Sequence, residues 1–181
     1  MGTPVVLVSG ENYPDALSVS SIAAQKGYPI LLVQKDGISS AVKQKIVAMK
    51  PDRVYIIGLQ GAAGENVEHE AGLLSRLAAE DLIRNGGEGR YNTSLAVAQY
   101  FFPSLSGFGS LSGVQTVCIA TGNNFTDALA GSVYAVQHQA PIILVDTNLP
   151  EQVIHYLVAR ELSKAAIFGG ERSREGYRRS A

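Results

Sequence analysis

Polar residues follow two apolar segments of the sequence, at the points where helices are predicted to begin. Each segment is followed by a glycine, an asparagine and an aspartate at the same spacing: Gly10, Asn12 and Asp15 in the first, Gly122, Asn124 and Asp127 in the second. The free N–H groups and partial positive charge of a helix start could bind an anion or a hydroxyl group there. The same residues could instead be structural, with the glycine permitting a tight turn, the asparagine capping the helix and the aspartate offsetting its dipole.

Arg90 is a further candidate, because it follows three glycines within residues 86–89 and precedes Tyr91. A guanidinium beside an aromatic ring is suited to contact an anion, a carboxylate or a sugar ring. A structural salt bridge would use the same arginine equally well.

Catalytic motifs are missing from the sequence. It contains no G-x-x-x-x-G-K-[ST], G-x-G-x-x-G, G-x-S-x-G or H-E-x-x-H pattern, and its three histidines are isolated. Glu11 could act in a metal-dependent phosphoryl- or nucleotide-processing enzyme, but the matching residue of the second segment is Asn123. Cys118 lies in an apolar run and is predicted to be a buried, inert thiol. We therefore predict no catalytic residue, no metal and no cofactor, and keep the enzyme as an alternative.

Composition excludes several classes of protein. The 181 residues are 46% hydrophobic and 17% charged, as in a packed globular chain, and the net charge of −1 argues against nucleic-acid binding through a basic surface. The 36 uncharged residues between Arg90 and Asp127 include Pro103, four glycines and five serines, so we predict no membrane span. The first residues lack the basic and apolar regions of a signal peptide and read as a strand.

An internal repeat is the strongest feature of the sequence. Sliding the chain by 112 residues places residues 6–33 over residues 118–145, with 12 of 28 positions identical. Short apolar runs alternate with segments of helical period in each copy. Because these runs are continuous, we predict α/β modules whose mainly parallel sheets are buried on both faces and flanked by helices.

The predicted elements of the first copy are strands at 4–9, 29–34 and 53–58 and helices at 14–26, 39–49 and from about 64. A short segment at 81–84 precedes the glycine turn, and a last helix is capped by Asn92 or Thr93 and stopped by Pro103. The segments Ile30-Leu31-Leu32 and Ile142-Ile143-Leu144 are predicted to be central strands.

Several motifs in a fixed order resemble the type 2 cell wall binding repeat of Gram-positive surface and S-layer proteins. They are S-G-E-N-Y-P-D-A-L, P-I-L-L, V-Y-I-I-G and G-E-G-R-Y-N-T-S-L-A-V-A, then T-G-N-N-F-T-D-A-L-A, P-I-I-L and A-I-F-G-G-E in the second copy. The resemblance covers residues 5–172 and implies tandem Toprim-like modules. It predicts repeat one at 4–105, a linker at 106–115, a truncated or degenerate repeat two at 116–172 and a basic tail at 173–181.

The resemblance implies a noncatalytic function. A secreted cell-surface protein would be held noncovalently to an anionic secondary cell wall polymer, with other repeats of the family as further partners. In the family the I-L-L stretch has been linked to polymer binding. The predicted polymer-binding residues are Asn12, Asp15, Asn124 and Asp127 at the helix starts, Arg90 with Tyr91, and, carried over from the family's I-L-L stretch, Ile30, Leu31, Leu32, Ile142, Ile143 and Leu144.

The second copy departs from the family pattern, because it stops after Glu171 and lacks a second R-Y-x-T segment. A third repeat is absent from this sequence, and fewer linked sites predict weaker binding. A purely structural module that self-associates is the remaining alternative.

Overall fold

The computed structural model describes residues 2–102, 116–159 and 162–169. The first repeat contains β1 (Val5–Ser9), α1 (Tyr13–Lys26), β2 (Ile30–Val33), α2 (Ser40–Met49), β3 (Val54–Ile57), α3 (Glu65–Ser75), the 3-10 helix η1 (Ala79–Asp81), β4 (Leu82–Asn85) and α4 (Gly89–Phe101). The second contains β5 (Thr116–Thr121), α5 (Phe125–Gln137), β6 (Ile142–Val145), α6 (Glu151–Val158) and β7 (Lys164–Phe168). The predicted linker and basic tail lie outside the described residues.

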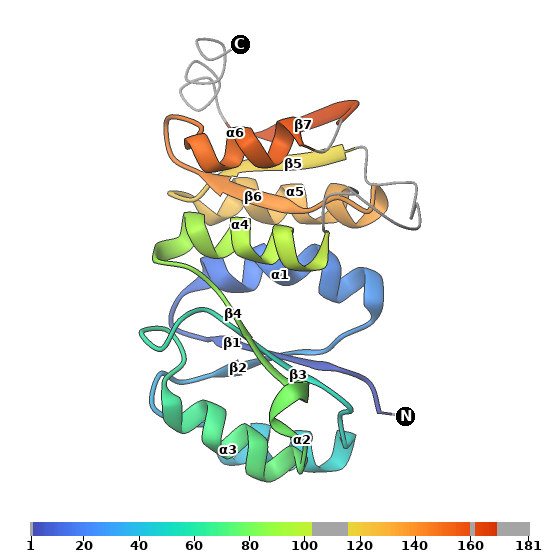
Figure 1. The fold of residues 1–181 in the computed structure, drawn as a ribbon, viewed down its shortest axis with the longest axis vertical. Helices are drawn as coiled ribbons and strands as arrows, with labels where there is room; N and C mark the ends of the chain where they lie inside the picture. The colour runs from blue at the N-terminus through green and yellow to red at the C-terminus, as the bar shows by residue number, and fades with distance from the viewer. Residues whose placement is uncertain (1, 103–115, 160–161, 170–181) are drawn as a thin grey trace.

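Two parallel sheets form the framework of the chain (Figure 1). The first has the strand order β2-β1-β3-β4 and the second β6-β5-β7, and every pair of neighbouring strands is parallel. The α/β fold of tandem modules is therefore confirmed. None of the described helices has the length and apolar character needed to cross a lipid bilayer.

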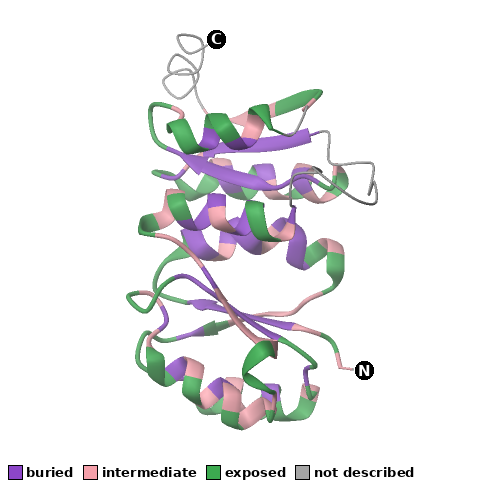
Figure 2. Ribbon diagram, in the orientation of Figure 1, coloured by how far each residue is buried: buried purple, intermediate pink, exposed green. Residues whose placement is uncertain are grey.

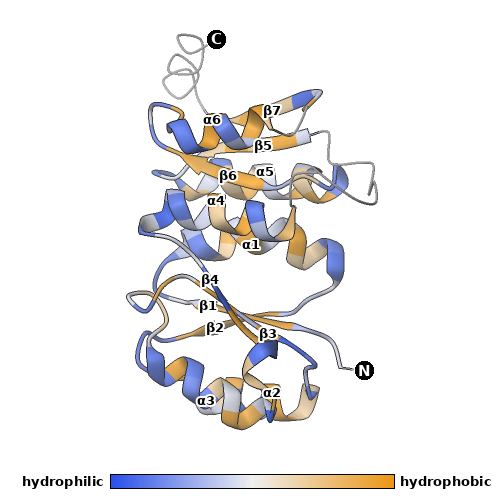
Figure 3. Cartoon of the chain, viewed as in Figure 1, coloured by the Kyte–Doolittle hydropathy of each residue, from blue (hydrophilic) through white to orange (hydrophobic). Residues whose placement is uncertain are grey.

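The sheets and helices stack in layers along the long axis of the molecule (Figure 1). Helices α2 and α3 cover one face of the first sheet, and α1 and α4 cover the other. The second sheet packs on α5 and on Leu17 of α1 through one face, and on α6 through the other. Buried strands lie between helices that carry many exposed residues, and the outer helices bear both hydrophilic and hydrophobic residues (Figures 2 and 3). The continuous apolar runs of β1, β3, β5 and β6 are buried on both faces, as predicted.

Helix α4 belongs to the first repeat by sequence but packs against both sheets. Val97 and Phe102, which directly follows α4, lie in the core of the first sheet, whereas Leu95 and Ala98 lie in a core with β5, β6 and α6. Ser94 of α4 also accepts a 2.9 Å hydrogen bond from the backbone N–H of Leu144, on β6. The core of the second sheet therefore includes side chains from a helix that precedes this sheet in the chain.

Two predictions about the elements are wrong. Helix α4 begins at Gly89 after Glu88, rather than after Asn92 or Thr93. Thr93 is used differently, since its hydroxyl accepts from the N–H of Gly87 and donates to the carbonyl of the same residue. Strands β2 and β6 are edge strands and not central ones, and Leu32 of β2 is 56% exposed.

Candidate functional site

A cavity of about 500 Å³ opens in the first repeat, beyond the carboxyl ends of β1, β3 and β4. Its walls come from the start of α1, the loop after β3 and the start of α4: Asn12, Pro14, Asp15, Leu59, Gly61, Ala62, Gly87, Glu88, Gly89, Arg90 and Thr93. The crossovers leave β1 and β3 toward opposite ends of the sheet, and ligands of open α/β sheets bind at such a switch point. The chain segments from which Asn12, Asp15 and Arg90 were chosen are therefore brought together.

Asp15 is the buried acid of this cavity. Its side chain lies in the first turn of α1 and the residue is only 8% exposed. Burial raises the pKa of the Asp15 carboxyl from 3.8 to about 6, and the nearby Arg90 charge opposes the rise. Within the described part of the chain, no hydrogen bond reaches this carboxylate from another residue. Such a group keeps its acceptor capacity for a ligand.

Gly58 lets the Asp15 carboxylate lie against the end of β3. Its φ of 102° lies in the region that favours glycine, and a Cβ built on it would lie 2.6 Å from Asp15 Oδ2. A side chain at this position would therefore displace the carboxylate.

Asn12 precedes α1 but makes no side-chain hydrogen bond that caps the helix. Asn124, the matching residue of the second repeat, does cap its helix, since its side-chain oxygen accepts from the N–H of Thr126 at 3.2 Å. Asn124 is therefore a structural helix cap, whereas Asn12 lines the cavity with a side-chain amide that caps no helix. Asp127 is half-buried in the first turn of α5.

Arg90 and Tyr91 contact the second repeat from the start of α4. Arg90 Nη1 donates to the carbonyl oxygen of Gly122 at 2.5 Å, and Tyr91 Oη donates to Asn123 Oδ1 at 3.1 Å. A Cβ on Gly122 would lie 2.6 Å from the Tyr91 ring, so glycine permits this approach. Arg90 thus lines the cavity and fixes the junction between the repeats at the same time.

The two apolar triplets lie in different environments. Residues Ile142, Ile143 and Leu144 are buried, and direct contact of their side chains with a polymer is incompatible with that burial. Ile30, Leu31 and Leu32 lie on β2, at the open edge of the first sheet. Ile30 and Leu31 are half-buried there, and Leu32 is exposed. Only the first triplet has surface that a ligand could reach.

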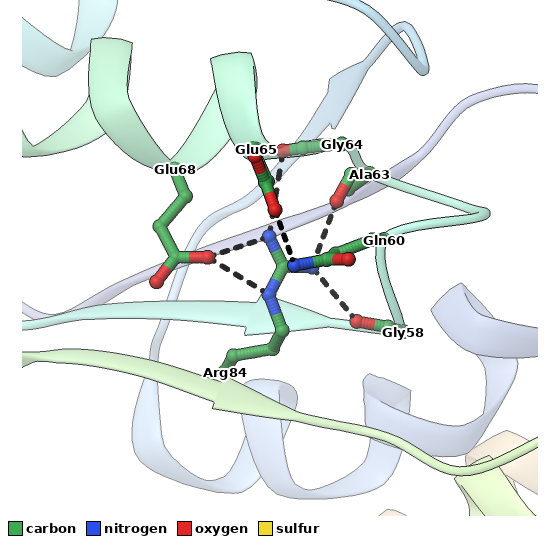
Figure 4. Close-up of polar contacts among 7 residues, drawn as sticks. All are labelled: Gly58, Gln60, Ala63, Gly64, Glu65, Glu68 and Arg84. Atoms are coloured by element: carbon green, nitrogen blue, oxygen red, sulfur yellow. Dashed lines mark hydrogen bonds and ion pairs between the residues drawn. The ribbon is translucent and has the colours of Figure 1, made fainter.

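Arg84 is a residue that the sequence analysis missed (Figure 4). Its guanidinium donates to Glu68 Oε2 at 2.8 and 3.0 Å, and to the carbonyl oxygens of Gly58, Ala63 and Gly64 at 2.8–3.4 Å. These contacts fix both ends of the loop that forms one cavity wall. Only its position as the single charged residue within the short segment 82–85 marks it in the sequence.

The residues considered for catalysis lie apart from the cavity or are inert. Glu11 is exposed, and no group of three or more acidic, histidine or cysteine side chains gathers as metal ligands among the described residues. Cys118 is buried, and burial raises the pKa of its thiol to about 12, as expected for an inert cysteine.

Comparison with known proteins connects this geometry to a family. A family described as cell wall binding domain 2 (CWB2) matches residues 2–68 and 84–174. The amidase enhancer of Bacillus subtilis (strain 168) is 31% identical over 156 residues, which are 83% of this chain and 20% of that protein. N-acetylmuramoyl-L-alanine amidase LytC of the same strain is 25% identical over 166 residues, which are 91% of this chain and 31% of that protein.

Solved structures have the same fold. Cwp6 from Clostridium difficile superposes with a TM-score of 0.81 and 27% identity, covering 92% of this chain and 25% of that one. Cwp8 from Clostridium difficile gives a TM-score of 0.78 and 26% identity, over 97% of this chain and 28% of that one. The chain spans about a fifth to a third of the length of these two Bacillus subtilis proteins. The resemblance inferred from the repeated motifs is confirmed, and the match to a binding domain replaces the enzymatic alternative.

Proposed function

Because the chain belongs to the cell wall binding domain 2 (CWB2) family, a cell wall binding module and not an enzyme, we propose that it anchors a surface protein to an anionic glycopolymer of the wall. The attachment is noncovalent, and the protein acts outside the cell as a secreted wall component. The single observation that carries this proposal is the cavity at which α1 and α4 begin, with Asp15 and Arg90 in its walls.

The polymer contacts the first repeat through Asn12, Asp15, Arg90 and Tyr91. Asn12 offers an amide that does not cap α1, and Arg90 holds a positive charge beside the cavity. The exposed Leu32 and its neighbours on β2 are available for further contacts along the chain of sugars. Weak sites linked in one protein gain affinity through effective concentration.

Cosedimentation with Gram-positive cell walls tests the proposal. Walls are compared before and after acid extraction of their anionic secondary polymers, and binding is expected only before extraction. Asn12→Ala is expected to weaken binding without loss of fold, because Asn12 makes no capping bond. Asn66→Ala, on the exposed surface of α3, is the matched control and should bind like the wild type. Equal binding to extracted walls would refute attachment through these polymers.

Self-association is a second candidate function, favoured by the unequal burial of α1 and α5. Leu17 of α1 is 8% exposed because it packs against the second sheet, whereas its repeat equivalent on α5, Leu129, is 53% exposed. Val133, one turn further along, is 63% exposed. We propose that a second copy of the chain occupies this α5 face, continuing the contact that α1 makes within one chain.

Sedimentation velocity tests this second candidate. The wild-type chain is expected to associate as its concentration rises, and Leu129→Glu is expected to remain monomeric. A wild-type chain that is monomeric at every concentration would refute self-association.

A further inference from the structure

Resting on the proposed function, the geometry points to a neutral, hydroxyl-bearing sugar unit as the part of the polymer that enters the Asp15 cavity. The charged groups of the polymer would then lie outside it. Three charged residues in the cavity walls, Asp15, Glu88 and Arg90, decide which part of the anionic glycopolymer is recognised.

The Asp15 carboxylate is the group that recognises the sugar. It is more than nine-tenths buried, faces the cavity and accepts no hydrogen bond within the described residues. An ionised carboxylate only accepts hydrogen bonds, through two oxygens. Neighbouring hydroxyl groups of a sugar ring supply two O–H donors at a spacing that one carboxylate can accept, whereas an ionised phosphodiester or carboxylate group supplies none.

The charge of the walls also disfavours an anion. Asp15 and Glu88 contribute two negative charges and Arg90 one positive charge. The Arg90 Nη1 group already donates to the carbonyl of Gly122, so part of its donor capacity is taken by the second repeat. The N-terminal end of α1, which attracts anions, already has the Asp15 carboxylate in its first turn.

The size of the cavity fits a sugar unit. A volume of about 500 Å³ lies within the range of sites for small molecules. Pro14, Leu59 and Ala62 supply apolar wall against which the C–H face of a ring can pack.

The titration of Asp15 gives a readout that separates the two kinds of ligand. The pKa of about 6 leaves the carboxyl mostly ionised at pH 7.5 and mostly protonated at pH 5. The titratable groups that line the cavity with it are Glu88 and Arg90 at the start of α4, while residues 58–64 contribute none. A neutral sugar accepted by the carboxylate should bind about tenfold more weakly at pH 5, whereas an anion should bind more tightly there.

The test is an NMR titration of the ¹⁵N-labelled chain. The probes are methyl glucoside and methyl N-acetylglucosaminide as neutral sugars and dimethyl phosphate, which has no hydroxyl group, as the anion, each at pH 7.5 and pH 5. We expect at least one glycoside, and not dimethyl phosphate, to shift the backbone amides of Asn12, Tyr13, Asp15 and residues 87–90 at pH 7.5. The shifts should weaken at pH 5 and in Asp15→Asn. Asp52→Asn removes the same charge from an exposed position at the opposite end of β3 and should leave the glycoside shifts unchanged.

The outcomes separate this inference from the proposed function. Shifts of the cavity amides by dimethyl phosphate alone, or by none of the three probes, would overturn the sugar assignment, even where the chain still cosediments with intact walls. Glycoside shifts that Asp15→Asn leaves intact would overturn the role of Asp15. Failure to cosediment with intact walls would refute the proposed function instead.

Discussion

Replacing the buried Asp15 carboxylate with the amide of asparagine is expected to stabilise the fold at neutral pH. The side chain keeps its shape in Asp15→Asn but loses a charge that burial disfavours. The same substitution removes the acceptor proposed for the ligand. Stability and binding should therefore change in opposite directions at one position.

The size of the effect follows from the pKa. A rise from 3.8 to about 6 is roughly two pH units, and at 1.36 kcal/mol per unit the charge costs the fold about 3 kcal/mol at pH 7.5. Water that reaches the carboxylate through the cavity reduces this cost. Asparagine also gives up the interaction with the helix dipole, about 0.3–1 kcal/mol. We expect a net gain of about 1–2 kcal/mol in the free energy of unfolding.

The gain should depend on pH with a definite sign. The folded-state pKa lies above the unfolded value, so the folded chain holds its proton to a higher pH. The wild-type free energy of unfolding therefore falls as pH rises from about 4 to about 6, and this contribution then levels off. Asp15→Asn lacks the titrating group, so its advantage should be small near pH 4.5 and largest at pH 7.5.

Urea unfolding followed by circular dichroism at pH 4.5 and 7.5 measures this difference. Asp127→Asn is the matched control, since Asp127 occupies the equivalent turn of α5 but is only half-buried. It should lose about 0.3–1 kcal/mol through the helix dipole. A loss of stability in Asp15→Asn at pH 7.5, or an effect that does not change with pH, would refute the reasoning.

Three further predictions concern the framework around the site. Arg84→Met should lower the free energy of unfolding by about 2–4 kcal/mol, because it removes charged hydrogen bonds to three backbone carbonyls. Urea unfolding measures the change, and a loss under about 1 kcal/mol would contradict the role of Arg84 in fixing the loop. Ser94→Ala should cost about 1–3 kcal/mol and speed hydrogen exchange at the Leu144 amide, and unchanged exchange there would count against the bond. Cys118 should resist Ellman's reagent at pH 8 in the native chain and react in urea, whereas rapid native labelling would show an accessible thiol.

The sequence predicts the parallel sheets well, because strands that are buried on both faces consist of continuous apolar runs. The apolar runs at Val5–Ser9 and Val54–Ile57 are central strands, and their continuity is sufficient to identify them. The edge position of β2 is not recorded in this way, because an edge strand can carry the same apolar residues. The predicted start of α4 is also wrong, since Thr93 has the side chain of a helix cap but forms its hydrogen bonds with Gly87 in the glycine turn.

The sequence predicts which types of residue form the site, but it does not predict which of them lie together in one cavity. Asp15 and Arg90 are far apart in sequence, and only the strand order brings both to one cavity. Asn12 and Asn124 match in the repeat alignment and yet differ in their hydrogen bonds, so identical residues do not ensure identical roles. Arg84 stabilises a loop through backbone carbonyls, which no side-chain pattern in the sequence reveals.

The position of α4 shows that the repeated unit of the sequence and the unit that folds are not the same. The genetic repeat places α4 at the end of the first copy, whereas its Leu95 and Ala98 are part of the core of the second sheet. A break of the chain after Phe102 would keep α4 with the first sheet but leave these side chains without their partners, and β6 without the Ser94 contact. The two copies are therefore expected to unfold in one transition, as a single cooperative body whose boundary does not follow the period of its sequence.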